Sequence, residues 1–461
     1  MAENPLPILA EHAASWRDRP MPAEVAHHAR RALIDWFAAL LPGCLHPPAT
    51  LLAAAMAPER GAGRAICYVD GQPGALRHAA LLNATASHSV EFDDIFRDAG
   101  YHPGCPTIGA ALAAAQSHGA TLDALLRAIT AGYEVSCRIG VAVQPSHYRY
   151  WHTTGTVGTF GAATATALLL GCDAGRTAHA IATAATFAGG LQQAFRSSGM
   201  SKPLHPGHAA DAGALAAIGA AAGVTGALDV LHGPVGFAAA TSEDAGKWDK
   251  ALAGLGERVA ITAMTFKNHG CCGHIFAGLD AVADLRAEHG FGPEDVAAIH
   301  LGGYGPTKEV CDRPEVGTEQ EARFSAQYCL AALLVLGGVR LAAFEPPALA
   351  DPRIRALMAL TSVSLDPELA ADYPGRRAAK VTIRLQDGRE LFRYQHTRKG
   401  DPDAPLSDGE LSAKFIELAA PVVGTAAARS LLDGLWHGDA LPGPVPLLAA
   451  RTVAHSAAAA E

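Results

Sequence analysis

The sequence contains few charged and few aromatic residues. Charged residues make up 18% of the chain and aromatic residues 6%, against a charged fraction of roughly 25% in soluble globular proteins. The hydrophobic fraction is nevertheless 49%, which excludes an intrinsically disordered chain. Much of it is alanine, in runs at residues 109–115, 162–170 and 209–222. Because alanine loses no side-chain entropy in a helix, the composition predicts closely packed helices rather than a sheet-dominated fold.

Positive charge is in deficit. The chain has 36 Lys and Arg against 45 Asp and Glu, a formal net charge of -9, and no segment gathers basic residues into a patch. Nucleic acids are bound largely through lysine and arginine, so we expect no nucleic-acid partner. A small anionic ligand remains compatible, because a few local cations suffice to hold it.

The sequence also lacks a long apolar run. A membrane-spanning helix needs about 20 apolar residues, and the best candidate, residues 209–224, contains Asp211 and three glycines. It is typical of a buried core helix. Residues 1–20 carry several charged side chains and no apolar stretch before a small-residue cleavage site. We therefore expect a cytoplasmic protein that does not associate with a membrane.

Two further classes of site find no support. The nine cysteines are odd in number and spread from Cys44 to Cys329, unlike the dense disulfide framework of a small secreted domain. We expect reduced thiols. Neither a G-x-x-x-x-G-K-[ST] motif nor a G-x-G-x-x-G motif after a strand is present, so no nucleotide cofactor is expected.

The length of 461 residues predicts two domains, because single cores stop growing at roughly 250–300 residues. Up to about residue 255, apolar residues recur every three or four positions, as in helices. The helices expected here are 23–41, 74–88, 107–117, 121–139, 156–170, 177–188, 208–222 and 227–231. Helical periodicity returns near the C-terminus at 407–418 and 425–435, and the tail at 449–461 is expected to fray.

The pattern between these helical segments is different. Strands are expected at 296–301 and 362–365, a helix at 319–336, and a hairpin formed by 380–385 and 390–394 about Asp387-Gly388, a strong turn signal. We therefore predict a mainly α fold, in which a large helical domain (residues 1–265 and 395–461) carries an inserted, smaller α+β lid domain (residues 266–394).

Four stretches concentrate polar side chains among the apolar helices: residues 88–94 with 101–104, 150–161, 199–213 and 266–274. The first contains the carboxylates of Glu91, Asp93 and Asp94, which repel one another unless they face water, cations or a substrate. His102 follows, and histidine titrates near neutral pH. A solvated acidic helix end is the alternative interpretation.

The second and third stretches add histidines and a lysine. His152 precedes a helix start rich in threonine and glycine, whose free N–H groups suit a carboxylate. A histidine without function is about as compatible with this pattern. Lys202 and His205 precede an alanine-rich helix, where a lysine can clamp a carboxylate or, if desolvated, act as a base. A solvated surface lysine is the alternative.

The fourth stretch contains Lys267, His269, Cys271, Cys272 and His274. Adjacent cysteines rarely ligate one tetrahedral ion, and no second Cys-x-x-Cys completes a zinc site. An iron–sulfur cluster needs about three or four suitably spaced thiolates. We expect no metal. The four stretches together suit a small polycarboxylate, which lysines and helix ends hold while a histidine or aspartate removes a proton from the adjacent carbon.

In these stretches the sequence resembles the MmgE/PrpD family, which includes 2-methylcitrate dehydratases, cis-aconitate decarboxylases and iminodisuccinate epimerases. The matching segments, in the family's order and spread over most of the chain, are 88–94 with 102–104, 132–134, 152–161, 201–205 with 207–210, and 266–267 with 271–274. The resemblance implies a large helical domain interrupted by an α+β lid, a homodimer, and proton chemistry without a metal or cofactor in a cleft between the domains.

The resemblance also implies site residues. By position, the catalytic residues would be Asp93, His102, His152, Lys202 and Lys267. We expect His152 to be the principal acid/base, Asp93 and His102 to handle protons as a pair, and the two lysines to hold carboxylates, although a lysine could exchange roles with His152. The expected substrate-binding residues are Glu91, His205, Cys272 and His274.

Three positions depart from the decarboxylase branch of the family. That branch has aspartate where Glu91 stands, threonine where Ile95 stands and histidine where Cys272 stands. We therefore expect a hydro-lyase similar to 2-methylcitrate dehydratase. The alternatives are an epimerase of an iminodisuccinate-like dicarboxylate, a cis-aconitate-type decarboxylase and, from another class, a non-catalytic helical binding protein with a degenerate site.

Overall fold

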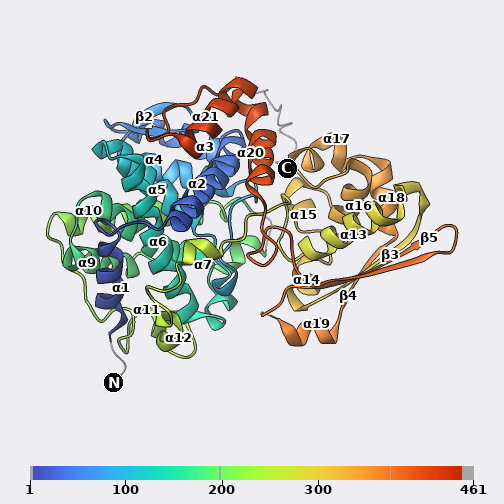
Figure 1. Cartoon of the computed structure of the whole chain (residues 1–461), viewed down its shortest axis with the longest axis horizontal. Coiled ribbons are helices and arrows are strands. Elements are labelled where there is room, and N and C mark those ends of the chain that lie inside the picture. The colour runs from blue at the N-terminus through green and yellow to red at the C-terminus, as the bar shows by residue number, and fades with distance from the viewer. Residues whose placement is uncertain (1–3, 197–198, 374, 449–461) are drawn as a thin grey trace, which may run out of the picture. The chain divides into compact units, whose positions relative to one another are not determined.

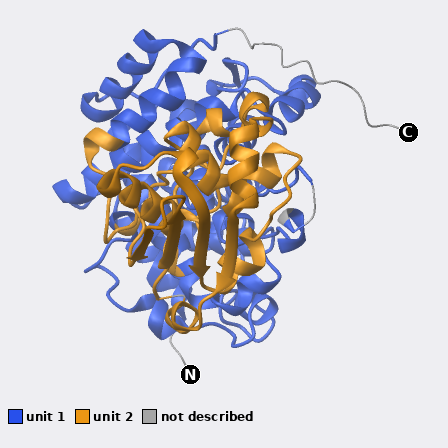
Figure 2. Ribbon diagram, turned by 90° about the vertical axis from the view of Figure 1, so that its right-hand side faces the viewer, with its two compact units in different colours: residues 1–89, 99–262, 411–461 blue, residues 90–98, 263–410 orange. Residues whose placement is uncertain are grey.

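A computed structural model describes residues 4–196, 199–373 and 375–448 (Figure 1). Over these residues helices predominate and strands are few, so the predicted mainly α class is confirmed. The chain divides into two compact units (Figure 2). Unit 1 comprises Met1–Ser89, Ala99–Thr262 and Leu411–Glu461, and unit 2 comprises Val90–Asp98 and Ala263–Glu410. The tail at 449–461, expected to fray, lies outside the described residues.

Unit 1 is built almost wholly from helices. They are α1 (Pro5–Ser15), α2 (Ala23–Gly43), α3 (Ala49–Met56), α4 (Leu76–His88), α5 (Gly104–His118), α6 (Leu122–Val143), α7 (Thr153–Thr156), α8 (Gly158–Leu169), α9 (Ala174–Ala185), α10 (Leu204–Ala221), α11 (Phe237–Thr241), α12 (Trp248–Leu252) and α21 (Thr425–His437), with most of α20 (Asp408–Val423). Two short strands, β1 (Ala65–Cys67) and β2 (Gln72–Gly74), pair antiparallel. None of the described helices is long and apolar enough to cross a membrane.

Small side chains let the central helices of unit 1 approach closely. Helix α10 packs against α8, α4 and α9, and its inward residues are mostly alanine and glycine. At Gly213 a Cβ atom would lie 2.6 Å from the Cβ of Ala162 and 2.6 Å from the carbonyl oxygen of Thr159, both on α8. The position therefore requires glycine, and the contact sets how closely α10 approaches α8.

Unit 2 is α+β. Its four-stranded sheet has the order β4 (Thr361–Leu365), β3 (Val296–Gly303), β5 (Ala379–Leu385), β6 (Glu390–Gln395), with β3 and β4 parallel and the other pairs antiparallel. Its helices are α13 (Phe276–His289), α14 (Gly305–Cys311), α15 (Glu319–Arg323), α16 (Ala326–Leu336), α17 (Pro346–Leu349), α18 (Pro352–Ala359) and α19 (Pro367–Asp372). The hairpin about Asp387-Gly388 is confirmed by the β5–β6 pairing.

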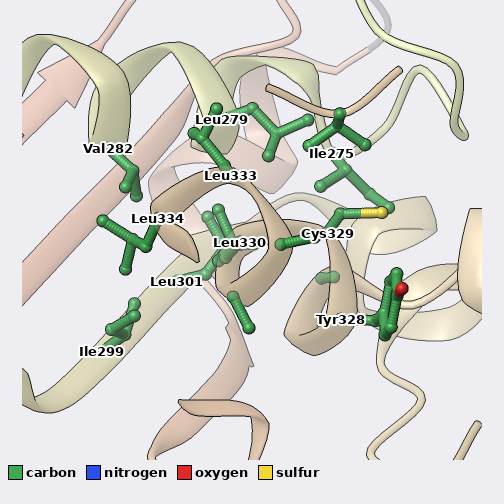
Figure 3. Packing of buried hydrophobic residues seen from close by; sticks show 14 of the residues in the cluster. Ile275, Leu279, Val282, Ile299, Leu301, Tyr328, Cys329, Leu330, Leu333 and Leu334 are labelled. Carbon is green, nitrogen blue, oxygen red and sulfur yellow. The ribbon is translucent and has the colours of Figure 1, made fainter. Parts of the chain in front are cut away.

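The core of unit 2 forms between this sheet and two helices. Figure 3 shows Leu279 of α13 and Leu333 and Leu334 of α16 packed near Ile299 and Leu301 of β3. Alternate residues of β5 join the same buried cluster, because side chains of a strand point to opposite faces in turn. The core anchors the loops on either side of α13, one of which carries candidate site residues.

Two expected helices differ in the structure. Residues 227–231 form a hydrogen-bonded turn rather than a helix, closed by Gly233 N–H donating to the Asp229 carbonyl at 2.7 Å, so that expectation was wrong. Gly233 and Pro234 follow too closely for a helix to propagate. The helix expected at 319–336 is divided into α15 and α16, because the Ser325 hydroxyl caps α16 by accepting from Tyr328 N–H at 3.0 Å.

Unit 2 also includes residues 90–98 and 395–410, which lie outside the 266–394 segment expected for the second domain. Ile95 forms an antiparallel bridge with Thr265, which joins the first of these segments to the unit. Arg398 and Asp401 join the second, since Arg398 donates to the Gly273 carbonyl at 2.9 Å and Asp401 accepts from the Thr265 hydroxyl at 2.5 Å.

The close approach at Gly213 yields a stability prediction. In Gly213→Ala the added methyl group must push α10 away from α8, which should lower the free energy of unfolding by about 1–3 kcal/mol. The matched control is Gly434→Ala in α21, where an added Cβ meets no neighbouring atom within 4 Å and should be neutral or stabilise by about 0.4–1 kcal/mol. Denaturant titrations followed by circular dichroism measure both. Equal stability of the two variants would contradict the packing argument.

Candidate active site

Four histidines of unit 1 come together from different elements. His88 ends α4, His102 lies two residues before α5, His152 directly precedes α7, and His205 lies in the first turn of α10. The ring centroid of His88 lies 5.1 Å from that of His102 and 5.6 Å from that of His152. The ring centroids of His152 and His205 are 5.1 Å apart. We call these four residues the histidine cluster. It forms because helix ends of the bundle meet at this point.

The tightest contact in the histidine cluster joins His152 and His205. Their Nδ1 atoms are 2.9 Å apart, a hydrogen-bond distance, so one ring donates its N–H to the lone pair of the other. The main chain also supports His152, whose N–H donates to the Gly190 carbonyl at 2.9 Å. His102 is placed in part by its N–H donating to the Thr154 hydroxyl at 3.3 Å.

The surroundings keep the paired imidazoles neutral. Burial lowers the pKa of His152 well below the usual value, and positive charge on His88, Lys202, His205 or His102 would lower it further. Burial, with His88, Lys202 and His208, lowers the pKa of His205 to about 4. A neutral imidazole has one proton to give and one lone pair to accept a proton, which is what acid–base catalysis needs.

Lys202 supplies a cation beside these neutral rings. It lies in the turn before α10 and is 6% exposed. Its carbonyl oxygen accepts from His205 N–H at 3.1 Å, and its positive charge lowers the pKa of both His152 and His205. A buried ammonium suits a carboxylate better than an exposed one, because the low local dielectric strengthens the attraction.

Unit 2 holds a second group of candidate residues, which includes Lys267, Glu91 and Asp93. The antiparallel bridge between Ile95 and Thr265, with N–H to carbonyl distances of 2.9 Å in both directions, lays residues 91–95 beside Lys267. The Lys267 Nζ is 3.3 Å from Glu91 Oε2 and 3.4 Å from Asp93 Oδ1. All three side chains are buried. We call these three residues the lysine–carboxylate triad.

The triad is electrostatically coupled. Burial alone would lower the pKa of Lys267, but the carboxylates of Asp93 and Glu91 outweigh burial and raise it. Lys267 therefore stays an ammonium at neutral pH. Glu91 has φ of 60°, in the left-handed region that is uncommon for residues other than glycine, and such conformations are often found at functional sites.

Cys272 and His274 lie on the loop before α13 in unit 2. Cys272 is buried and its N–H donates to the Arg323 carbonyl at 2.8 Å. The Nδ1 of His274 is 2.9 Å from the Tyr304 hydroxyl. Burial, with Arg377 and Arg398, lowers the pKa of His274 well below the usual value, so this ring is also neutral.

The cysteines of this loop face the core of unit 2. Cys271 and Cys272 belong to its apolar cluster together with Cys311 and Cys329. Burial raises the pKa of Cys311 and Cys329 well above the usual value, which disfavours the thiolate form that binds metals. All nine cysteines lie within the described residues, where they are buried and not disulfide-bonded.

Seven of the nine expected residues therefore fall into two groups, one per unit, and Cys272 and His274 lie apart on the loop before α13. The histidine cluster and Lys202 bring together His102, His152 and His205, and the triad brings together Glu91, Asp93 and Lys267. Sequence reasoning missed His88 and Tyr304. His88 is the first residue of the polar stretch 88–94, so its position in that stretch could have marked it as a candidate. Tyr304 follows a strand, and the sequence around it carries no signal beyond the flanking glycines.

The lowered pKa of His152 makes stability depend on pH. Because the unfolded chain binds a proton at this histidine near pH 6.5 and the folded chain does not, stability falls as the pH drops below about 6.5. His152→Asn should remove about one proton from this dependence, a slope of about 1.4 kcal/mol per pH unit. Denaturant titrations at several pH values between about 7 and 5 measure the slope. An unchanged slope would mean that folded His152 is protonated.

Comparisons with known proteins agree with the resemblance seen in the sequence. A family model described as the MmgE/PrpD N-terminal domain matches residues 8–248, and one described as the MmgE/PrpD C-terminal domain matches residues 269–437. A Homo sapiens protein named cis-aconitate decarboxylase is 28% identical over 367 residues, 77% of this chain and 75% of its own. An Aspergillus oryzae protein named as cis-aconitate decarboxylase-like is 29% identical over 439 residues, 87% of this chain and 88% of its own. Since the two models together span most of the sequence, the chain belongs to the MmgE/PrpD family.

Proposed function

We propose that the protein is a lyase that makes or discharges a carbanion next to a carboxylate of a small di- or tricarboxylate, without a metal or cofactor. The observation that carries the proposal is the contact between the Nδ1 atoms of His152 and His205, 2.9 Å apart, in a pair of rings kept neutral beside the Lys202 ammonium. A neutral base next to a cation suits this chemistry, because the cation stabilises the negative charge that develops on the carboxylate.

His152 is the principal acid/base in this proposal, and Lys202 is the principal carboxylate holder. The Lys267 ammonium already faces Glu91 and Asp93. A substrate carboxylate would add a third negative charge around that one cation, which like-charge repulsion disfavours unless a proton is shared. Lys267 is thus better suited to hold Glu91 and Asp93 in place than to bind a substrate alone.

Dehydration is the first candidate reaction, as in 2-methylcitrate dehydratases. His152 takes the proton from the carbon next to a carboxylate, the electron pair forms the carbon–carbon double bond, and the β-hydroxyl leaves with a proton as water. Glu91, Ile95 and Cys272, the three departures from the decarboxylase branch, favour this route. The family resemblance supports a homodimer as the working form.

Decarboxylation of cis-aconitate is the second candidate. The names of the human and Aspergillus oryzae relatives favour it. In this reaction a carboxylate leaves as carbon dioxide and the resulting carbanion takes a proton, for which His152 would act as the acid. Both reactions use the same histidine in opposite protonation states.

One experiment separates the candidates. The protein is incubated in deuterated water with 2-methylcitrate, citrate, cis-aconitate and iminodisuccinate, and products are followed by NMR and polarimetry. A new alkene with loss of the hydroxyl indicates dehydration, loss of carbon dioxide from cis-aconitate indicates decarboxylation, and deuterium incorporation with a change in optical rotation indicates epimerisation. Silence with every substrate would contradict the proposal and favour a binding protein.

Lys202→Ala should reduce turnover to background while leaving the fold intact, because it removes the ammonium beside the paired imidazoles. The matched control is Lys250→Ala, an exposed lysine on α12, which should retain wild-type kcat/KM. Steady-state kinetics and circular dichroism spectra of both variants provide the comparison. Near-wild-type activity of Lys202→Ala would remove Lys202 from the mechanism.

A further inference from the structure

His205 connects the buried His152 with a hollow at the surface of unit 1. The hollow has a volume of about 690 Å³ and is lined by residues within 189–194 and 199–208, including His205 and His208. His152 is 2% exposed, whereas His205 is only partly buried. The short contact between the two Nδ1 atoms therefore lies between a buried ring and a space that water can fill.

The backbone holds this contact in place from both sides. Trp151 and Leu191 form an antiparallel bridge, flanked by His152 N–H donating to the Gly190 carbonyl and Gln192 N–H donating to the Tyr150 carbonyl, each at 2.9 Å. Gly190 has φ of 132°, and a Cβ there would lie 3.2 Å from Nδ1 of His205. Glycine thus lets the segment that supports His152 also pass close against the ring of His205.

We propose that His205 is a positioning and proton-relay residue: it sets the tautomer of His152 and carries protons between His152 and water in the hollow. This role rests on the proposed function of His152 as the acid/base. It differs from direct substrate binding, which the sequence favoured for His205.

In this relay each ring gives up one proton for every proton that it accepts. In the base-ready state, Nδ1–H of His152 donates to Nδ1 of His205, and Nε2 of His152 has a lone pair. When Nε2 accepts a proton from the substrate carbon, the Nδ1 proton of His152 moves to Nδ1 of His205, and the Nε2 proton of His205 passes to water. Both rings are then neutral again with their tautomers exchanged, and Nε2–H of His152 is ready to protonate a carbanion.

The charges around the pair favour this neutral exchange over storage of a proton. His88, His102 and Lys202 lie near His152, and His88, Lys202 and His208 lie near His205. Positive charge on any of them disfavours an imidazolium ion in the pair. A proton that reaches the pair is therefore passed on rather than retained.

The test compares His205→Ala with His208→Ala. His208 lines the same hollow, but its Nε2 lies 3.1 Å from the Phe187 carbonyl. With a substrate that the wild type converts, His205→Ala should lower kcat about 100-fold while KM changes little. Free imidazole, which can enter the enlarged hollow, should restore kcat saturably, and His208→Ala should behave as wild type with no response to imidazole.

The kinetic outcomes show whether His205 relays protons, binds the substrate or has neither role. Wild-type kcat in His205→Ala, or a loss that imidazole does not restore in a variant with a native circular dichroism spectrum, would overturn the relay. A rise in KM with unchanged kcat would assign His205 to substrate binding and also overturn it. If His205→Ala fails to fold, His205→Gln replaces it and should show the same loss of kcat.

A second measurement does not depend on turnover. In protein labelled with ¹⁵N-histidine, NMR should show a ring N–H proton protected from exchange that disappears in both His152→Ala and His205→Ala and persists in His208→Ala. Its absence from the wild type would overturn the relay. If the signal is present but no substrate of the panel reacts, the proposed function fails while the hydrogen-bonded pair stands.

Discussion

The helical unit depends on close contact between helix backbones, which only small side chains permit. Alanine and glycine on α10 and α8 bring these helices together, and the packing places the ends of the helices relative to one another. The candidate site of this unit is made of helix ends, so its geometry follows from the packing. Low aromatic content and a close cluster of histidines are thus two results of the same mode of packing.

Burial disfavours the charged form in both groups of candidate residues, but the neighbouring charges give the two groups different outcomes. In the pair of His152 and His205, burial favours the uncharged form, and neighbouring positive charges act in the same direction. In the lysine–carboxylate triad the charges persist, because Lys267 lies between two carboxylates. We therefore propose proton transfer for the neutral pair of His152 and His205, whereas the lysine–carboxylate triad keeps fixed charges in place.

Much of the helical pattern could be read from the sequence, because apolar periodicity and glycine or proline breaks mark helices directly. The hairpin about Asp387-Gly388 could also be predicted, because Asp-Gly is a strong turn signal. The break at Ser325 was hidden, because apolar residues continue on both sides and the cap is a local hydrogen bond. The candidate residues were found because they lie in four polar stretches of the sequence. The pairing of His152 with His205 could not be foreseen, since 53 positions separate them and the contact arises from the fold.

The left-handed conformation of Glu91 has a consequence for how this family can change. Aspartate tolerates that conformation better than glutamate, and it is also one methylene group shorter. Exchange between the two at this position therefore eases the backbone and, at the same time, draws the carboxylate away from the Lys267 ammonium. A single carbon atom at position 91 thus adjusts both the strain of the chain and the balance of charge around Lys267.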